Sequence, residues 1–227
     1  MKILNQSATF LWLLCITGSL FFSCTADFLE RPPLGSLDED TYIGTEEAGF
    51  KLLVNCYLPL AANWEYQNMR FDIGDQLTDD AAKGGSDAGD RSTITELTRG
   101  NPLATNTLLT DLWNHRYKTA ISACNVFLNL ITPETELIES GGALVSEAKK
   151  RRWIAEAHFL RAFYYYDLAT VFVNIPLIQE PMNAIDKNDI VKSDKEVVKA
   201  FILADLEKAL NESNIPGAGD LSSSELG

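Results

Sequence analysis

Two long segments of this chain repeat apolar residues at steps of three or four, and this spacing restricts the possible folds more than any other feature. The segments are residues 106–131 and 144–172. Such steps place side chains on one face of an α-helix, whereas a half-buried strand requires strict alternation of apolar and polar residues. No segment of the sequence alternates convincingly. The sequence therefore predicts an all-α protein.

Four main helices are expected. The first begins at Thr45, is followed by two acids suited to a first helical turn, and ends or kinks at Pro59. Its expected apolar face is Phe50, Leu53, Val54 and Tyr57, with Cys56 beside it. The second helix covers residues 106–131, and its stripe is Leu109, Trp113, Tyr117, Ala120, Cys124, Leu128 and Ile131.

The third helix covers residues 144–172, with an inner stripe of Trp153, Ala157, Leu160, Tyr164 and Leu168. Its two embedded polar residues, Arg161 and Asp167, are expected to pair with neighbours, because a lone buried charge is costly. The last helix is expected to start at Ser193, since Glu196 completes a capping box. Its apolar face is Val198, Phe201, Ile202, Leu206, Ala209 and Leu210.

Residues 63–105 have no helical period and are rich in glycine and aspartate. They predict a long ordered loop with one short helical turn, and loops of this length inside a compact domain are usually functional or disordered. Large residues at one position and alanines at another along the later helices favour tetratricopeptide-like helix pairs. An ordinary helical bundle is the alternative.

The N-terminus predicts export. Lys2 precedes an apolar run over residues 10–22, and a small residue then stands before Cys24. This order is typical of a secretory signal, here cut directly before a cysteine that would carry a lipid. The alternative, an uncleaved anchor, is disfavoured because a spanning helix needs roughly 20 apolar residues. We expect a signal peptide at 1–23, an extended tether at 24–44 and a helical domain at 45–227.

Charge and cysteine usage narrow the function classes. The formal net charge is −13, which disfavours binding to nucleic acid or to an anionic bilayer surface. Cys56 and Cys124 both lie in helical apolar patterns, where buried free thiols are common. A disulfide between them is the alternative in an exported protein.

Several phrases together resemble one family. They are the lipidation site, a tether of Phe28-Leu29-Glu30-x-Pro32-Pro33, Leu112-Trp113-x-x-x-Tyr117, Phe159-Leu160-Arg161-Ala162-Phe163-Tyr164-Tyr165, and Asn174-Ile175-Pro176-Leu177-Ile178. In this order they resemble the SusD/RagB family of Bacteroidetes. None of the phrases is a catalytic motif, and the helical phrases also have a packing explanation.

The resemblance implies an outer-membrane, surface-exposed lipoprotein that binds a nutrient, most often a glycan, and delivers it to a SusC-like TonB-dependent transporter. It also implies a SusD-like all-α fold. Family members are more than twice as long, so we expect the helical domain to be incomplete at its C-terminus. A SusD-like protein for oligopeptides and a helical-repeat envelope scaffold without a nutrient ligand are the alternatives.

Two groups of residues are candidates for ligand binding. Trp64 and Tyr66 lie beside Asn68 and Arg70, a combination that suits stacking on sugar rings and hydrogen bonding to hydroxyls. The resemblance places Asp79 and Asp80 on the side that faces the ligand or the transporter. The surrounding aspartates could suit calcium, but no EF-hand order is present, and a solvated acidic loop is favoured over a metal site.

Enzyme chemistry is not expected. Acids crowded on a loop lack the rigid separation that glycoside hydrolysis requires. His115 and His158 have no second ligand at metal spacing. The sequence contains no phosphate loop after a strand and no serine nucleophile elbow. No catalytic residue, metal or cofactor is predicted.

Overall fold

The computed structural model describes residues 44–61, 73–87, 89–100, 102–181 and 190–215. All of them belong to the second of two compact units, Ile43–Gly227. The helical elements are α3 (Glu46–Tyr57), η2 (Leu58–Leu60), α5 (Ser92–Thr98), α6 (Thr107–Trp113), η3 (Asn114–Ile121), α7 (Ser122–Leu130), α8 (Glu147–Val171) and α9 (Lys195–Leu210). Within the described residues, extended segments meet only in isolated bridges, such as Pro176 with Lys192. The predicted all-α class is confirmed.

The first helix starts and stops where the sequence predicts. The Thr45 hydroxyl accepts a hydrogen bond from the Ala48 amide, which satisfies one of the free amides of the first turn of α3. The α-helix ends at Tyr57, and η2 continues the chain as a short 3₁₀ turn that contains Pro59.

The buried face of α3 differs from the expected stripe. Leu53 and Cys56 are buried, but Phe50 is 51% exposed and Val54 and Tyr57 are also exposed. Small residues one turn earlier, Ala48 and Gly49, face the core instead. A Cβ on Gly49 would lie 2.9 Å from the Cδ1 of Leu137, so this side of α3 packs closely on its neighbours. The expected stripe was wrong because it counted only large apolar residues.

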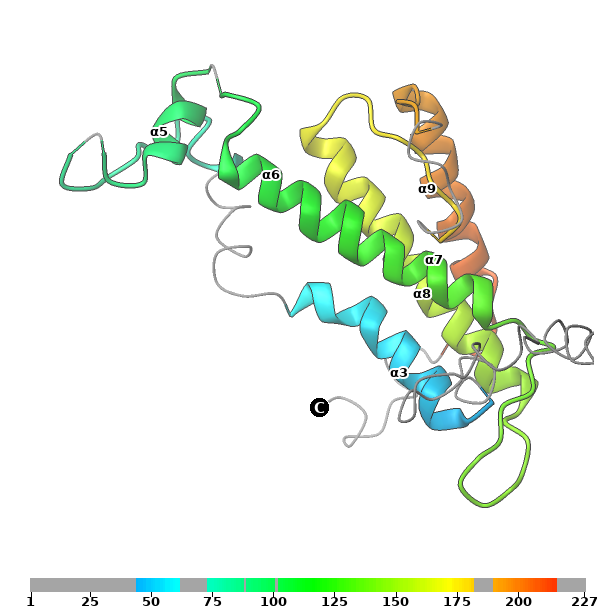
Figure 1. Ribbon diagram of the computed structural model, residues 1–227. Coiled ribbons are helices and arrows are strands. Elements are labelled where there is room, and N and C mark those ends of the chain that lie inside the picture. The colour runs from blue at the N-terminus through cyan, green and yellow to red at the C-terminus, as the bar shows by residue number, and fades with distance from the viewer. Residues whose placement is uncertain (1–43, 62–72, 88, 101, 182–189, 216–227) are drawn as a thin grey trace, which may run out of the picture. The chain divides into compact units, whose positions relative to one another are not determined.

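The predicted helix at 106–131 forms one continuous rod of three segments, α6, η3 and α7 (Figure 1). It begins at Asn106, whose side chain accepts a hydrogen bond from the Leu108 amide. The middle segment, η3, is π-helical. One sign of its wider turn is the Thr119 hydroxyl, which donates to the carbonyl of Asn114, five residues earlier.

The long helix α8 lies at the centre of the packing. Ser146 caps it by accepting a hydrogen bond from the Lys149 amide. The whole predicted inner stripe, Trp153 to Leu168, is buried. α8 packs against α3, η3, α7 and α9 (Figure 1), which explains why it carries buried aromatics on more than one side.

The last helix, α9, packs along α8, and its N-cap lies one residue later than predicted. Asp194 occupies the N-cap position without a side-chain cap hydrogen bond, so the capping box at Ser193 was wrong. The Ser193 amide instead donates to the carbonyl of Ile175. Val198, Ile202 and Ala209 are buried as predicted, whereas Leu210 is 85% exposed.

Both thiols outside the N-terminal segment are buried and free. Cys56 on α3 and Cys124 on α7 have no exposed surface. Burial raises the pKa of Cys124, which keeps it protonated and unreactive. The favoured prediction of buried free thiols agrees with the structure. Within the described residues, no helix is both long enough and apolar enough to cross a bilayer.

Candidate functional site

The structure reaches only part of the predicted site. Cys24, Trp64 and Tyr66 lie outside the described residues. Asp79 and Asp80 are described, and both are exposed on the acidic loop, defined here as residues 73–91. Within the described part of the chain, neither carboxylate has a hydrogen-bond partner, although the Asp80 amide donates to the Thr78 hydroxyl. Both carboxylates are therefore available to accept hydrogen bonds from a ligand.

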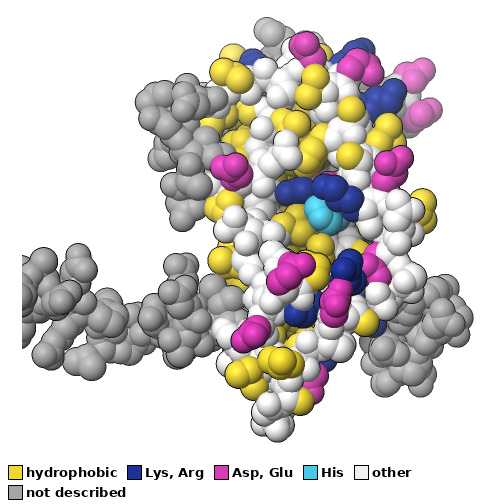
Figure 2. Space-filling view, turned by 90° about the vertical axis from the view of Figure 1, so that its right-hand side faces the viewer, with side chains coloured by type: hydrophobic (Ala, Val, Ile, Leu, Met, Phe, Trp, Pro, Cys, Tyr) yellow, Lys and Arg dark blue, Asp and Glu magenta, His cyan; other side chains and the backbone are white. Residues whose placement is uncertain are grey.

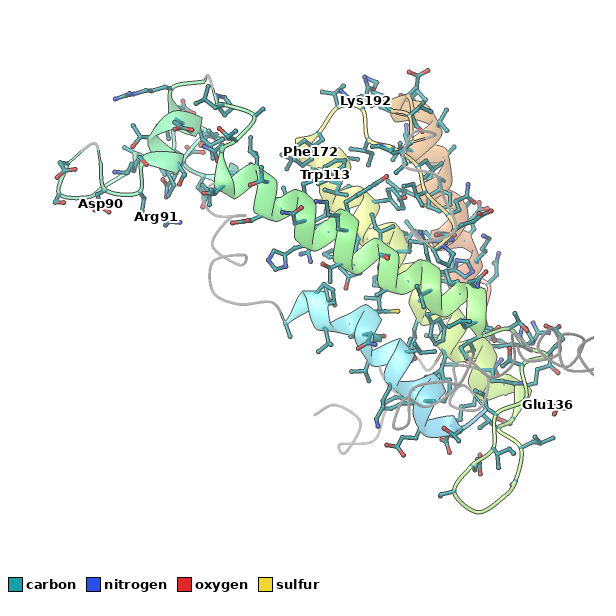
Figure 3. The ribbon with its side chains drawn as sticks, viewed as in Figure 1. Asp90, Arg91, Trp113, Glu136, Phe172 and Lys192 are labelled. Carbon is teal, nitrogen blue, oxygen red and sulfur yellow. The ribbon has the colours of Figure 1, made fainter. Side chains whose placement is uncertain are left out.

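Asp87 and Asp90, near the end of this loop, accept hydrogen bonds from the loop's own backbone amides. Asp87 Oδ1 accepts hydrogen bonds from the amides of Gly89, at 2.7 Å, and Asp90, at 3.2 Å. Asp90 Oδ2 accepts from the Ser86 amide at 3.3 Å. These bonds fold the loop tightly before Arg91, which has a left-handed backbone (φ 49°) at the start of α5 (Figure 3). The aspartates of the loop thus divide into structural and free ones.

A polar recess of about 540 Å³ lies between the acidic loop and α5. Its lining includes Thr78, Thr95 and Thr98, together with Lys83 and Asp87. The Lys83 ammonium donates to the Asp87 carbonyl at 3.3 Å. Within the described residues, no group of three or more histidine, cysteine, aspartate or glutamate side chains could hold a metal ion. The recess is therefore lined by side chains that can form hydrogen bonds with a polar ligand.

A second recess, which we call the aromatic recess, lies where the end of α8 meets α6 and η3. Its volume is about 470 Å³, and it is lined by Ala104, Leu109, Thr110, Trp113, Asn114, Lys118 and Phe172. Trp113 stacks on Tyr117 with ring centroids 4.5 Å apart and meets the Phe172 ring edge-on at 5.3 Å. Figure 3 shows Trp113 and Phe172 side by side.

Two buried polar networks connect the helices of the core. In the first, Arg116 Nε donates to Asp167 Oδ2 at 2.6 Å, and Arg116 Nη1 donates to the Pro59 carbonyl at 3.0 Å. Both side chains of the ion pair are 3% exposed. This network connects η2, η3 and α8, and it confirms the expectation that Asp167 is paired.

The second network connects α7, α8 and α9. Arg161 donates to the Asp205 carboxylate and to Asn125 Oδ1, and His158 Nδ1 lies 2.9 Å from Asp205 Oδ1. Burial alone would raise the pKa of Asp205, but hydrogen bonds from His158 and Arg161 outweigh it and lower the pKa to about 2. The expected pairing of Arg161 is confirmed.

Charged side chains on one face of the described residues are mixed with apolar ones. Figure 2 shows one face on which acidic, basic and hydrophobic side chains are interspersed. The local ion pairs on α8, such as Arg151 with Glu147, are exposed and spaced by one helical turn. The net negative charge of the chain is therefore not gathered into one patch on that face.

Comparison with known proteins identifies the family. A sequence profile described as "Starch-binding associating with outer membrane", one of the SusD-like profiles, matches residues 27–212. The chain belongs to the SusD-like family. The resemblance found in the sequence is thereby confirmed. This SusD-like chain is 25% identical over 202 residues to a SusD-like protein of Bacteroides ovatus, across 88% of the chain and 34% of that relative.

Solved structures confirm the tetratricopeptide-like helical class for this SusD-like chain. Surface glycan-binding protein A from Bacteroides fluxus is 26% identical, with a TM-score of 0.62 over 80% of this chain and 36% of that one. A SusD-like carbohydrate binding protein from Bacteroides fragilis is 25% identical, with a TM-score of 0.63 over 82% of this chain and 35% of that one. The chain spans about a third (34%) of the length of the curated relative.

The sequence did not point to the aromatic recess. Trp113 was assigned to the buried stripe of its helix, and it does pack partly against the core. Its second role, as a wall of the recess, depends on Phe172, which comes from the end of a different helix. No spacing rule brings these two residues together, because only the packing of α8 against η3 does so.

Proposed function

We propose that this SusD-like chain is a non-catalytic lipoprotein that binds a glycan at the cell surface. The observation that carries the proposal is the family match over residues 27–212, whose profile describes starch-binding proteins associated with the outer membrane. The names of two similar solved structures, a surface glycan-binding protein and a carbohydrate binding protein, support the same ligand class.

The acidic loop is the proposed binding surface. Sugar hydroxyls donate hydrogen bonds to carboxylates, and Asp79 and Asp80 have carboxylates without a partner among the described residues. The polar recess beside them supplies further hydroxyl groups and the Lys83 ammonium. We propose that Trp64 and Tyr66, which precede the loop in sequence, supply the stacking faces.

The membrane attachment and the partner belong to the same proposal. A diacylglycerol on Cys24 would anchor the protein to the outer membrane, with 24–44 as its tether. A SusC-like TonB-dependent transporter would receive the glycan. Feeding labelled palmitate to cells that express the wild-type chain or Cys24→Ala tests the anchor: label should follow only the wild type, and a labelled variant would contradict lipidation at this position.

An arrayed binding screen tests the ligand class. The full chain, purified in detergent, is presented with plant, host and microbial polysaccharides and, in parallel, with mixtures of oligopeptides. Binding to one or more polysaccharides supports the proposal. Binding to peptides alone would replace the glycan with a peptide ligand, and binding to neither, with co-purification of envelope proteins that include no transporter, would favour a scaffold.

A further inference from the structure

We propose that the aromatic recess is a second sugar subsite, separate from the acidic loop, that holds one or two neutral pyranose units. The inference rests on the proposed glycan binding and adds to it a place and a ligand type. The aromatic recess has a volume of about 470 Å³, which lies within the ordinary range for small-ligand sites, roughly 300–1,000 Å³.

The apolar part of the recess is rigid before any ligand arrives. Trp113 is stacked on Tyr117 at an angle of 25° between the rings, and the Phe172 ring meets it at 87°. Both Trp113 and Phe172 pack partly against the hydrophobic core, yet both still line the recess. Aromatic side chains held in this way lose little conformational entropy when a flat sugar face packs on them.

The polar part of the recess matches the rim of a sugar ring. Asn114 and Lys118 line the recess from η3 and are exposed. Among the described residues, neither the Asn114 amide nor the Lys118 ammonium has a hydrogen-bond or ion-pair partner. Thr110 donates its hydroxyl proton to the Thr107 carbonyl, which leaves its oxygen free to accept. Donors and an acceptor around an aromatic wall are the groups that hydroxyl-rich rings require.

The π-helical segment helps explain why these groups meet. π-Helical turns are rare and occur frequently at functional sites. Here η3 follows directly after Trp113, and the segment carries both Asn114 and Lys118. On its inner side, Arg116 is fixed by the buried ion pair with Asp167, so the segment cannot turn freely. The segment that forms one wall of the recess, η3, is thus fixed to the core by Arg116.

Charge favours a neutral sugar over an acidic one. Lys118 is the one cation among the residues that line the recess, and the formal net charge of the chain is −13. A uronate would have to approach against this excess of negative charge. A neutral pyranose pays no such cost and still accepts a hydrogen bond from the Lys118 ammonium.

Calorimetric titration of the full chain with maltohexaose, laminarihexaose and cellohexaose tests the inference. Asn114→Ala and Lys118→Met should each weaken the best of these ligands about fivefold, the equivalent of one lost hydrogen bond. Asn129→Ala and Lys199→Met, exposed on α7 and α9, are the matched controls and should bind like the wild type. Trp113→Ala should weaken binding further, but it is interpreted only if its circular dichroism and melting temperature match the wild type.

The outcomes separate this inference from the proposed function. If the wild type binds none of the three hexasaccharides and no polysaccharide in the screen, both fail. If the wild type binds but Asn114→Ala and Lys118→Met stay within twofold of their controls, only the second subsite is overturned. Tighter binding of an oligogalacturonate than of any neutral hexasaccharide, lost in Lys118→Met, would overturn the neutral ligand.

Discussion

Arg161 on α8 donates two hydrogen bonds to the carboxylate of Asp205 on α9, from Nε at 2.7 Å and from Nη2 at 3.1 Å. The Asp205 side chain has no exposed surface and that of Arg161 is 5% exposed. The pair therefore connects the last two helices from within the core, where a charge without its partner is costly.

Removing one member of this pair should strongly destabilise the chain. We expect Asp205→Ala to lower the free energy of unfolding by about 3–5 kcal/mol, because it leaves the Arg161 guanidinium buried without its carboxylate. Urea unfolding followed by circular dichroism measures the change. Glu207→Ala, exposed on the same helix, should change it by less than about 0.5 kcal/mol. A loss below about 1 kcal/mol in Asp205→Ala would show that water reaches the pair.

The Asp205 carboxylate should make the free energy of unfolding depend on pH in the acid range. The folded pKa of Asp205 is about 2, below its ordinary value of 3.8, so its contribution is present above about pH 4 and is lost as the pH falls toward 2. The shift corresponds to roughly 2 kcal/mol. Unfolding free energies measured from pH 5 to pH 2 should fall less steeply in Asp205→Asn than in the wild type. Equal slopes would mean that other carboxylates cause the acid sensitivity.

Two neighbouring tyrosines provide a matched test of a buried hydroxyl. The Tyr165 hydroxyl donates to the Ile178 carbonyl at 2.8 Å and accepts from the Ile178 amide at 2.9 Å, whereas Tyr166 is 55% exposed. Tyr165→Phe leaves both backbone groups of Ile178 without this partner and should cost about 1–3 kcal/mol. Tyr166→Phe should cost less than about 0.5 kcal/mol. Equal effects would contradict the role of this hydroxyl in holding the segment after α8.

The two buried thiols should resist labelling until the protein unfolds. Cys56 and Cys124 have no exposed surface, and burial raises the pKa of Cys124, so little thiolate is available to react. Mass spectrometry after brief treatment with iodoacetamide at pH 8 should find neither residue modified in native protein and both modified in urea. Rapid modification of Cys124 alone in native protein would indicate local opening between α3 and α7.

The acidic loop should contribute to ligand affinity without contributing to stability. Asp79→Asn/Asp80→Asn should weaken the best polysaccharide from the screen by about five- to tenfold, because two carboxylate acceptors are lost. The melting temperature should not change, since both side chains are exposed and neither carboxylate forms a hydrogen bond with another described residue. Glu136→Gln, in the loop between α7 and α8, is the control for a lost surface charge (Figure 3). Unchanged affinity would remove these two residues from the proposed site.

The sequence predicted the helices well, but it predicted less well which face of each helix is buried. The spacing from Leu109 to Ile131 correctly indicated one long rod, but a run of three- and four-residue steps does not reveal a π-helical segment inside it. On α3, Gly49 faces the core where the expected stripe placed Phe50. Such close packing depends on Leu137, from a distant loop, and local spacing does not contain that information.

For the candidate sites too, the sequence does not reveal which distant residues come into contact. Arg161 and Asp167 could be predicted as paired because any buried charge needs a partner, but their partners Asp205 and Arg116 come from other helices. Asp79 and Asp80 were chosen by resemblance to a family, and the structure adds that they are exposed. The aromatic recess escaped prediction because a tryptophan in an apolar stripe looks the same whether one side of it is covered or open.

The wide turn of η3 has a genetic consequence. Each residue of an α-helix advances its side chain by about 100° around the axis, whereas a π-helical turn holds about one residue more than an α-helical turn. Deleting one codon within Asn114–Ile121 would therefore return the segment to α-helix, with Trp113 still in the recess and Asn125 still within reach of Arg161. Such a deletion should be tolerated far better here than within α7, where the loss of one residue turns the two ends of the rod relative to each other.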